Sequence, residues 1–236
     1  MKNQVAQPGA YQELGFEERL SLLASEELSC RENKKAERLV KQAKFRLNAE
    51  LSKLDYRSSR GLEKVLIRSL SQGNWLNLKQ NLLLTGATGS GKTYLAGALG
   101  HNACRQGYKV YYYRLKALME QCYQGHADGR YSKLLTKLNH SEQLLLDDWG
   151  LEPLSSEQRS DLLEIVDLMY QRGSIIVVSQ LPVDSGYKMI GDSTHADDIL
   201  DRLVHGSIKI ELKGESMRKM QTSLTNTCKN SSVKVT

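Results

Sequence analysis

Short apolar runs alternate with longer segments of helical periodicity from residue 81 to residue 212. The runs are four to six residues long and rich in Leu, Ile, Val and Tyr, which is typical of strands in a buried sheet. Between them, apolar residues recur every three or four positions, which is typical of amphipathic helices. This alternation predicts an α/β fold with a parallel sheet flanked by helices. The expected strands are 81–85, 109–114, 143–146, 174–179 and 208–212.

Three local features refine this outline. Residues 115–123 and 131–138 are expected to be helices joined by a mobile surface loop over 124–129, because that link carries two glycines and charged residues. Ser155 is expected to cap the following helix, because a glutamine three residues later completes a capping box. The three consecutive tyrosines at 111–113 lie inside an expected strand, so we interpret them as sheet residues rather than as a platform for stacking bases.

The first third of the chain shows only helical patterns, in three segments. The first begins at Phe16, with Leu20 and Leu23 on the same face. The second, 31–47, is strongly amphipathic, and its apolar side consists of Ala36, Leu39, Val40, Ala43 and Leu47. The third, 61–70, is expected to turn Leu62, Val65, Leu66 and Leu70 inward.

The composition changes at two places along the chain. A polar, glycine-containing stretch at 71–74 separates the helical segments from the alternating region, and the sequence after residue 221 is Ser, Thr, Asn and Lys with little apolar content. We therefore predict a small basic all-α domain over residues 1–72, a core domain over 73–221 and a disordered tail over 222–236.

Composition narrows the class of protein. The chain has 236 residues, of which 40% are hydrophobic and 25% charged, as in water-soluble globular proteins. It contains no membrane-spanning apolar run and no signal-peptide core, so we expect a cytoplasmic protein without membrane contacts. Its four cysteines lie far apart with no C-x-x-C pair, which argues against a zinc site and a disulfide framework.

Positive charge is concentrated near the N-terminus. The formal net charge is +6, yet residues 31–68 alone carry twelve basic and five acidic residues. An ordinary solvated helix face usually mixes signs, and that remains the alternative. Dominance of one sign on one face favours a surface that neutralises the phosphates of duplex DNA, largely without reading sequence. The candidate DNA-binding residues are Arg31, Lys34, Lys35, Arg38, Lys41, Arg57 and Arg60.

The clearest chemical motif follows the first expected strand. It has the P-loop spacing G-x-x-x-x-G-K-[ST] between an apolar run and a helical pattern. Glycines let several backbone N–H groups converge on a polyphosphate, and the helix that follows points its positive end at the same place. An ordinary glycine-rich turn is the alternative, which the full spacing in this context disfavours. The predicted ATP-binding residues are Gly86, Ala87, Thr88, Gly89, Ser90, Gly91, Lys92 and Thr93.

Particular roles follow from this motif and from the next buried strand. Lys92 is expected to reach the β- and γ-phosphates, and the Thr93 hydroxyl to hold Mg²⁺. The run Leu144–Leu146 delivers two carboxylates to the end of a strand, where ligands bind in open α/β sheets. Asp147 suits a Walker B residue that holds Mg²⁺ through water, and Asp148 is placed to orient or deprotonate the attacking water.

Two further polar positions come later in the chain. The strand 174–179 ends in Ser179 and Gln180, polar groups delivered where a γ-phosphate should lie, although a polar residue at a strand end is equally ordinary. A short helix over 195–203 is expected to present Arg202.

Together these landmarks resemble the AAA+ family, and within it the IstB-type helper ATPases of bacterial insertion sequences. The resemblance covers residues 11–221. It is carried by the stretches 16–20, 31–35, 55–57, 60–62, 86–93, 146–151, 179–182, 199–203 and 211–216.

The resemblance implies more than the residues do alone. It implies a Mg²⁺-dependent, DNA-stimulated ATPase that forms homo-oligomers with ATP at subunit interfaces. Arg202 would be the arginine finger that reaches a neighbour's γ-phosphate, and Gln180 or Ser179 would be the sensor 1 residue. The basic helices and the core would grip double-stranded DNA while a cognate transposase is recruited or stimulated.

Two other functions compete with this one. A replicative helicase loader of the DnaC or DnaI kind would share the core, but DnaI-like loaders carry a cysteine-rich zinc module before it, where this chain has only Cys30. A small-molecule or nucleoside kinase would share the P-loop, but no arginine-rich lid or acceptor pocket is visible in the sequence. The pair Asp147-Asp148 suits activation of water better than a kinase reaction.

Overall fold

The computed structural model of this chain describes residues 14–56, 61–182, 190 and 193–213. The expectations for Arg57, Arg60 and the tail 222–236 fall outside these residues. None of the helices in the described part of the chain has the length and apolar character to cross a bilayer.

Five parallel strands form one sheet in the order β2-β3-β4-β1-β5. They are β1 (Leu82–Gly86), β2 (Val110–Arg114), β3 (Gln143–Trp149), β4 (Ser174–Ser179) and β5 (Ile208–Leu212). The five predicted strands are confirmed, with shifts of one residue at some ends and an extension of β3 to Trp149. Because all the strands run in one direction, their carboxyl ends gather along one edge of the sheet.

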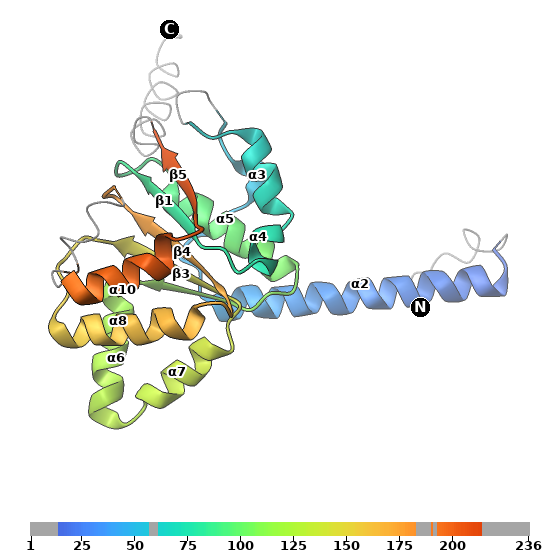
Figure 1. Ribbon diagram of the computed structural model, residues 1–236. Coiled ribbons are helices and arrows are strands. Elements are labelled where there is room, and N and C mark those ends of the chain that lie inside the picture. The colour runs from blue at the N-terminus through green and yellow to red at the C-terminus, as the bar shows by residue number, and fades with distance from the viewer. Residues whose placement is uncertain (1–13, 57–60, 183–189, 191–192, 214–236) are drawn as a thin grey trace, which may run out of the picture.

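Helices cover both faces of the sheet (Figure 1). One face carries α3 (Lys64–Ser71), α4 (Asn74–Asn77), α5 (Lys92–Arg105) and the end of α2 (Phe16–Ala43). The other carries α6 (Leu115–Asp128), α7 (Tyr131–Asn139), α8 (Ser156–Met169) and α10 (Ser193–Val204). Successive residues of β3 face opposite layers, with Leu145 toward α5 and Leu144 and Leu146 toward α8, as the period of two in a strand requires.

The helices before residue 73 share a hydrophobic core with the sheet. Leu39 and Ala43 of α2 and Leu70 of α3 are buried in the same cluster as Leu82 and Leu84 of β1. Burial of this apolar surface attaches the described part of the basic N-terminal region to the rest of the molecule. The division at residue 72 stays a prediction.

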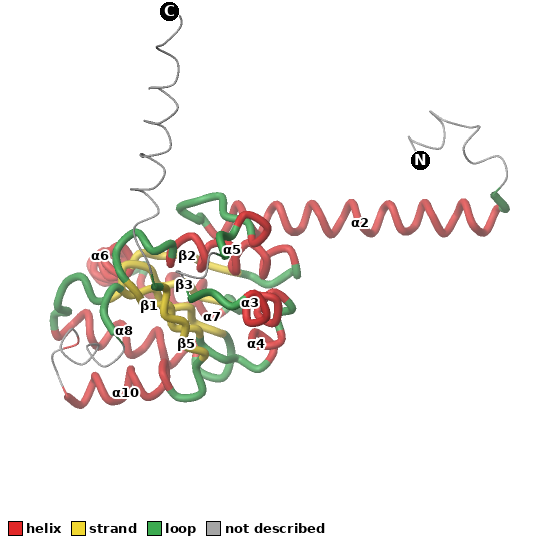
Figure 2. The backbone as a smooth tube through the Cα atoms, turned by 90° about the horizontal axis from the view of Figure 1, so that it is seen from above, coloured by secondary structure: helices red, strands yellow, loops and turns green. Residues whose placement is uncertain are grey.

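The long helix α2 differs from its predicted form. It is one continuous helix of 28 residues, where we expected separate segments with the second reaching Leu47. It ends at Ala43 because Lys44 adopts a left-handed conformation (φ 57°), and Leu47 lies beyond it, 44% exposed. Figure 2 shows the helix extending away from the body of the protein. At its beginning Phe16 is 80% exposed, so the predicted apolar face there is not buried within the described residues.

After α2 the chain turns back along α5. Phe45 stacks on His101 with ring centroids 4.3 Å apart, and a His101 ring nitrogen lies 3.3 Å from the Leu47 carbonyl oxygen. Gly100 of α5 allows this close approach, because a Cβ there would lie 2.6 Å from a Phe45 ring carbon. A Cβ on Gly97, one turn earlier, would make only an ordinary contact, 3.5 Å from Ala49. We refer to residues 45–50 as the α5 strap.

These two glycines give a matched test of the α5 strap. Gly100→Ala should lower stability by up to about 2 kcal/mol, because the cost of about 1–3 kcal/mol for overlap of its methyl group with Phe45 exceeds the gain of about 1 kcal/mol from alanine in the helix. Gly97→Ala should leave stability unchanged or raise it, since its methyl group makes an ordinary contact and alanine favours the helix by about 1 kcal/mol. Urea unfolding of both variants checks the opposite signs, and equal effects would contradict the close packing of Phe45.

Two predicted elements need correction. α6 continues to Asp128, so the predicted mobile loop over 124–129 was wrong. Gly125 serves helix packing instead, because a Cβ there would lie 3.0 Å from the backbone of Tyr131 in α7. In α3, Val65 is 80% exposed and Ile67 is buried in its place, because the face that packs on the core is the one that carries Leu66, Ile67 and Leu70.

Other local predictions are confirmed. Ser155 Oγ accepts a hydrogen bond from the Gln158 backbone N–H at 3.3 Å, and Ser155 N–H donates to the Gln158 side chain. The three tyrosines lie in β2. Separately from these predictions, the structure buries the thiols of Cys104 and Cys122, and burial raises the pKa of each to about 12.

Candidate nucleotide-binding site

The P-loop joins the carboxyl end of β1 to the first residue of α5. Gly86, Gly89 and Gly91 have φ values of 137°, 82° and 94°, a region that residues with a Cβ rarely adopt. A Cβ on Gly86 would also overlap the Leu212 carbonyl of β5. The local backbone therefore requires glycine at these motif positions.

A cleft of about 480 Å³ lies beside the P-loop. This volume is within the usual range for sites that hold a small molecule or cofactor. Its lining includes the P-loop residues Thr88, Gly89, Gly91, Lys92 and Thr93 together with Asp147, Asp148 and Gln180. The cleft therefore brings together the predicted metal-binding residues and most of the predicted phosphate-binding and catalytic residues. Gly86, Ala87 and Ser90 belong to the P-loop but do not line the cleft, and Arg202 lies elsewhere.

The cleft is also lined by residues that sequence reasoning missed. Arg46, Leu47, Lys53, Leu54 and Asp55 line it. They follow α2 and reach the P-loop because the α5 strap runs back along α5, where the Tyr94 hydroxyl lies 3.3 Å from the Glu50 backbone nitrogen. No motif marks these residues, although Arg46 and Lys53 belong to the basic cluster noted in the sequence.

Lys92 points into the P-loop. It is only 6% exposed, and its Nζ donates to the carbonyl oxygens of Gly86 at 2.7 Å and Ala87 at 2.8 Å. Burial lowers the pKa of Lys92, and the nearby Asp147 and Asp148 oppose that shift. An ammonium group here is placed to exchange these carbonyl partners for phosphate oxygens, which bind it more strongly.

The Asp147 carboxylate is held by three donors. It is 1% exposed; Oδ1 accepts from Thr93 Oγ1 at 3.2 Å and from the Asp148 N–H at 2.9 Å, and Oδ2 accepts from the Tyr112 hydroxyl at 2.7 Å. Burial, together with the adjacent Asp147 carboxylate, raises the pKa of Tyr112. The hydroxyl and carboxylate oxygens of Thr93 and Asp147 are the hard ligands that Mg²⁺ prefers.

The protein ligands at this site suit a Mg²⁺ ion that phosphates and water also coordinate, rather than a metal ion bound by protein side chains alone. No group of three or more His, Cys, Asp or Glu side chains in the described ranges could hold a metal ion. Mg²⁺ in nucleotide sites is usually bound by one or two protein oxygens plus phosphates and water.

Asp148 has an unusual backbone. Its φ is 58°, in the left-handed region, and the register of β3 against β4 is irregular between Leu146 and Trp149. Strained backbone conformations cluster at active sites and ligand-binding sites. The Asp148 carboxylate lies 3.5 Å from Nε of Arg114, the last residue of β2.

The two candidates for the sensor 1 residue, at the end of β4, point to different places. Gln180 lines the cleft, and its Oε1 accepts from the Thr88 hydroxyl of the P-loop at 2.6 Å. Ser179 is 7% exposed, and its hydroxyl exchanges hydrogen bonds with the backbone of Leu181. Gln180 is therefore the one of the two that faces the P-loop.

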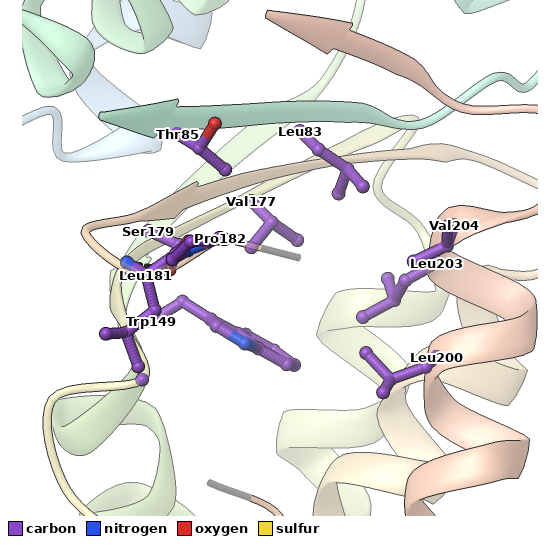
Figure 3. A pocket seen from close by; sticks show the side chains of 11 residues that line it. Leu83, Thr85, Trp149, Val177, Ser179, Leu181, Pro182, Leu200, Leu203 and Val204 are labelled. Atoms are coloured by element: carbon purple, nitrogen blue, oxygen red, sulfur yellow. Dashed lines mark hydrogen bonds between the residues drawn. The ribbon is translucent and has the colours of Figure 1, made fainter. Parts of the chain in front are cut away.

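A second, much smaller cavity lies on the other face of the sheet. Figure 3 shows the Trp149 side chain extending toward Leu200 of α10, below Leu83 and Val177. The volume of about 30 Å³ is roughly that of one water molecule. Its lining is almost wholly apolar, so it offers no binding site for phosphates.

Arg202 lies far from the cleft of its own chain. Its guanidinium forms ion pairs with Asp167 of α8 and with Asp198 at 3.8 Å, and its carbonyl oxygen accepts from Asn81 Nδ2 at 2.8 Å. Asn81 precedes β1 and the P-loop follows it, so the two ends are about 17 Å apart along a five-residue strand. Arg202 therefore cannot reach a phosphate bound to Lys92 of the same subunit.

The basic face of α2 is open to solvent. Arg31, Lys34, Lys35, Arg38 and Lys41 are all exposed, and none of them lines the nucleotide cleft. Arg31 is bound to Glu27 one turn earlier, at 2.7 Å. The structure therefore keeps the predicted DNA-binding residues of α2 together but separate from the P-loop.

Comparisons with known proteins agree with this geometry. The sequence model of a family described as "IstB-like ATP binding protein" matches residues 1–225. A Sinorhizobium fredii protein named as insertion sequence ATP-binding protein y4pL is 45% identical over 213 residues, which cover 90% of this chain and 87% of that one. The ATP-binding protein named for insertion sequence IS1162 of Pseudomonas fluorescens is 48% identical over 174 residues, covering 73% of this chain and 75% of that one.

One solved structure illustrates the likeness in fold. A crystal structure of the DnaC helicase loader superposes with a TM-score of 0.60 at 24% identity and covers 72% of this chain and 100% of that one. The shared architecture confirms the predicted α/β class with a parallel sheet between helices.

Proposed function

Because this chain belongs to the family of IstB-like ATP-binding proteins, we propose that it is a DNA-binding ATPase that assists or regulates a transposase during insertion-sequence transposition. The observation that carries the proposal is the convergence of the P-loop, Asp147 and Gln180 on a single cleft. Names of relatives that refer to insertion sequences support the transposition setting.

In this proposal the P-loop residues 86–93 bind the phosphates of ATP through their backbone N–H groups. Lys92 leaves the carbonyl oxygens of Gly86 and Ala87 and pairs with the β- and γ-phosphates. Thr93 would hold Mg²⁺ through its hydroxyl and Asp147 would hold it through water, and the bound ion would neutralise charge on the phosphates.

Residues other than those that bind the phosphates and the metal act on the attacking water and the γ-phosphate. Asp148 orients or deprotonates it, since its carboxylate lies beside the metal-binding residues and is partly accessible to solvent. Gln180, which is bonded to Thr88, takes the sensor 1 position and contacts the γ-phosphate. Electrostatic stabilisation by such fixed groups supplies most of the catalysis in phosphoryl transfer.

Arg202 completes the site from a second subunit. Its distance from its own P-loop leaves action in a neighbouring subunit as the way for it to meet a γ-phosphate. The active unit is therefore a homo-oligomer with ATP at the interfaces, and the chain-to-chain contact is heterologous.

DNA binding is assigned to the exposed basic face of α2. Because no base-reading motif is visible, the contacts are to the phosphate backbone and the binding is largely independent of sequence. A helicase loader shares the fold at 24% identity, whereas relatives with insertion-sequence names reach 48%, and this difference favours the transposition helper.

The proposal is tested by phosphate release from ATP and Mg²⁺ with and without duplex DNA, together with electron microscopy of the same mixtures. We expect hydrolysis that duplex DNA stimulates and assemblies of several subunits on the DNA. A protein that remains monomeric and inactive with both ligands would contradict the proposal.

Reversing the charge of Lys34, Lys35 and Arg38 together should weaken binding to all duplexes alike. Each lost phosphate contact should reduce the magnitude of the negative slope of log affinity against log salt concentration by about 1. The triple variant should therefore have a slope that is shallower by about 3. Fluorescence anisotropy across a salt series measures this slope.

A matched control reverses three exposed basic residues on the body of the protein, Lys133, Arg172 and Lys209. It changes the net charge by the same amount but leaves α2 intact. If both triple variants weaken DNA binding equally, net charge and not the α2 face determines the affinity.

A further inference from the structure

We propose that the Tyr112 hydroxyl is a positioning group for Mg²⁺: by holding one oxygen of Asp147, it keeps the other oxygen directed at Thr93. This inference rests on the proposed ATPase function and adds to it a residue outside the P-loop and the Walker B strand end.

The geometry divides the work of the two Asp147 oxygens. Among the described residues, the donor to Oδ2 is the Tyr112 hydroxyl, at 2.7 Å. Oδ1 accepts from the Asp148 N–H at 2.9 Å and from Thr93 Oγ1 at 3.2 Å. The longest of the three hydrogen bonds is therefore the one between Thr93 and Asp147, the two groups that would have to separate to bind the metal and its water.

Burial makes the tyrosine bond necessary. The Asp147 side chain is 1% exposed, so water replaces few of the hydrogen bonds that the carboxylate would have in solution. A buried charged oxygen without a donor is costly, and the carboxylate would turn to share its remaining donors. Rotation of the carboxylate would move Oδ1 away from Thr93, so the oxygens of Asp147 and Thr93 would no longer be held in a fixed arrangement for the metal.

Strand geometry explains why Tyr112, and not its neighbours, takes this role. Tyr112 packs with the α5 layer, whereas Tyr111 and Tyr113 pack with the opposite layer. The Tyr111 hydroxyl accepts from Gln42 at 2.8 Å and that of Tyr113 from Lys137 at 2.6 Å. Arg114, two residues further on the same face of β2, reaches Asp148 at 3.5 Å, so β2 supplies one side chain to each carboxylate.

The test compares Tyr112→Phe with Tyr113→Phe in the full chain. Both changes remove one hydroxyl from a partly buried hydrogen bond in the same strand. The probe is a fluorescent, non-hydrolysable ATP analogue, titrated first in EDTA and then with increasing Mg²⁺ at fixed analogue concentration. The readouts are the metal-free affinity and the Mg²⁺ concentration for half-maximal change.

We expect Tyr112→Phe to raise the half-saturating Mg²⁺ concentration by about 10- to 100-fold, as for other residues that orient metal ligands, with the metal-free affinity unchanged. Tyr113→Phe should match the wild type in both readouts. In the Asp147→Asn background, adding Tyr112→Phe should have little further effect, because the carboxylate that it positions is gone.

Three results would overturn the inference. The first is that Tyr112→Phe needs the same Mg²⁺ concentration as the wild type. The second is that Tyr112→Phe loses affinity for the ATP analogue equally with and without Mg²⁺. The third is loss of the fold, which would give the hydroxyl a structural role. If the wild-type protein itself does not bind the analogue, the proposed ATPase function fails instead.

Discussion

A Lys92→Ala protein is expected to hydrolyse ATP about 10²- to 10³-fold more slowly than the wild type, the usual effect of removing one preorganised charge that stabilises the transition state. The lysine is 6% exposed inside the P-loop and within 3 Å of two loop carbonyl oxygens, so its ammonium group is held where the phosphates are proposed to bind. Steady-state phosphate release at saturating ATP measures the effect.

The matched control for this prediction is Lys116→Ala. Lys116 is an exposed lysine that pairs with Glu152 at 2.9 Å, away from the nucleotide cleft. Its loss should leave the rate unchanged. Hydrolysis at the wild-type rate by Lys92→Ala would remove the P-loop from the mechanism.

An Arg202→Ala protein should bind ATP normally and hydrolyse it at least about 10³-fold more slowly, since an arginine finger contributes 10³–10⁵ to kcat. The separation of Arg202 from its own P-loop predicts that the defect can be complemented. When Arg202→Ala is mixed in equal amounts with Asp148→Asn, about one interface in four pairs an intact finger with an intact water-activating residue. The mixture should recover a comparable fraction of wild-type activity.

The ion pair between Arg202 and Asp167 provides the control for a purely structural role. Asp167→Ala breaks that pair but keeps the guanidinium. If Arg202 only holds α10 against α8, Asp167→Ala should be as defective as Arg202→Ala. If Arg202 acts on a neighbour's ATP, Asp167→Ala should remain active. Absence of complementation in the mixed proteins would argue against a shared site.

Much of the core could be predicted because its signals are local. The five strands are short apolar runs that the sheet must bury, and the order of strand and helix follows from their alternation. The P-loop is equally local, since the positive φ values at Gly86, Gly89 and Gly91 are demands of the loop itself. The prediction was wrong where one residue type has two structural roles. Glycine is common in loops, but Gly125 lies in a helix and lets α6 pack closely against α7.

Periodicity also misjudged the N-terminal region. A helical wheel shows which residues share a face, but not whether anything packs against that face. Leu39 and Ala43 are buried against the core, whereas Phe16, on the same helix, is 80% exposed. The pattern could not locate the end of α2 either, because the turn at Lys44 is tied to the packing of Phe45 on α5.

The α/β core, the P-loop and the strand that carries Asp147 and Asp148 follow from local sequence, because each depends on neighbours within a few residues. The distant residues that meet there are set by the three-dimensional packing: Arg46 and Asp55 in the cleft lining, Gln180 in preference to Ser179, and Tyr112 on Asp147. The same packing places Arg202 at the far end of β1. These arrangements depend on packing between layers, and packing joins residues whose separation along the chain carries no signal.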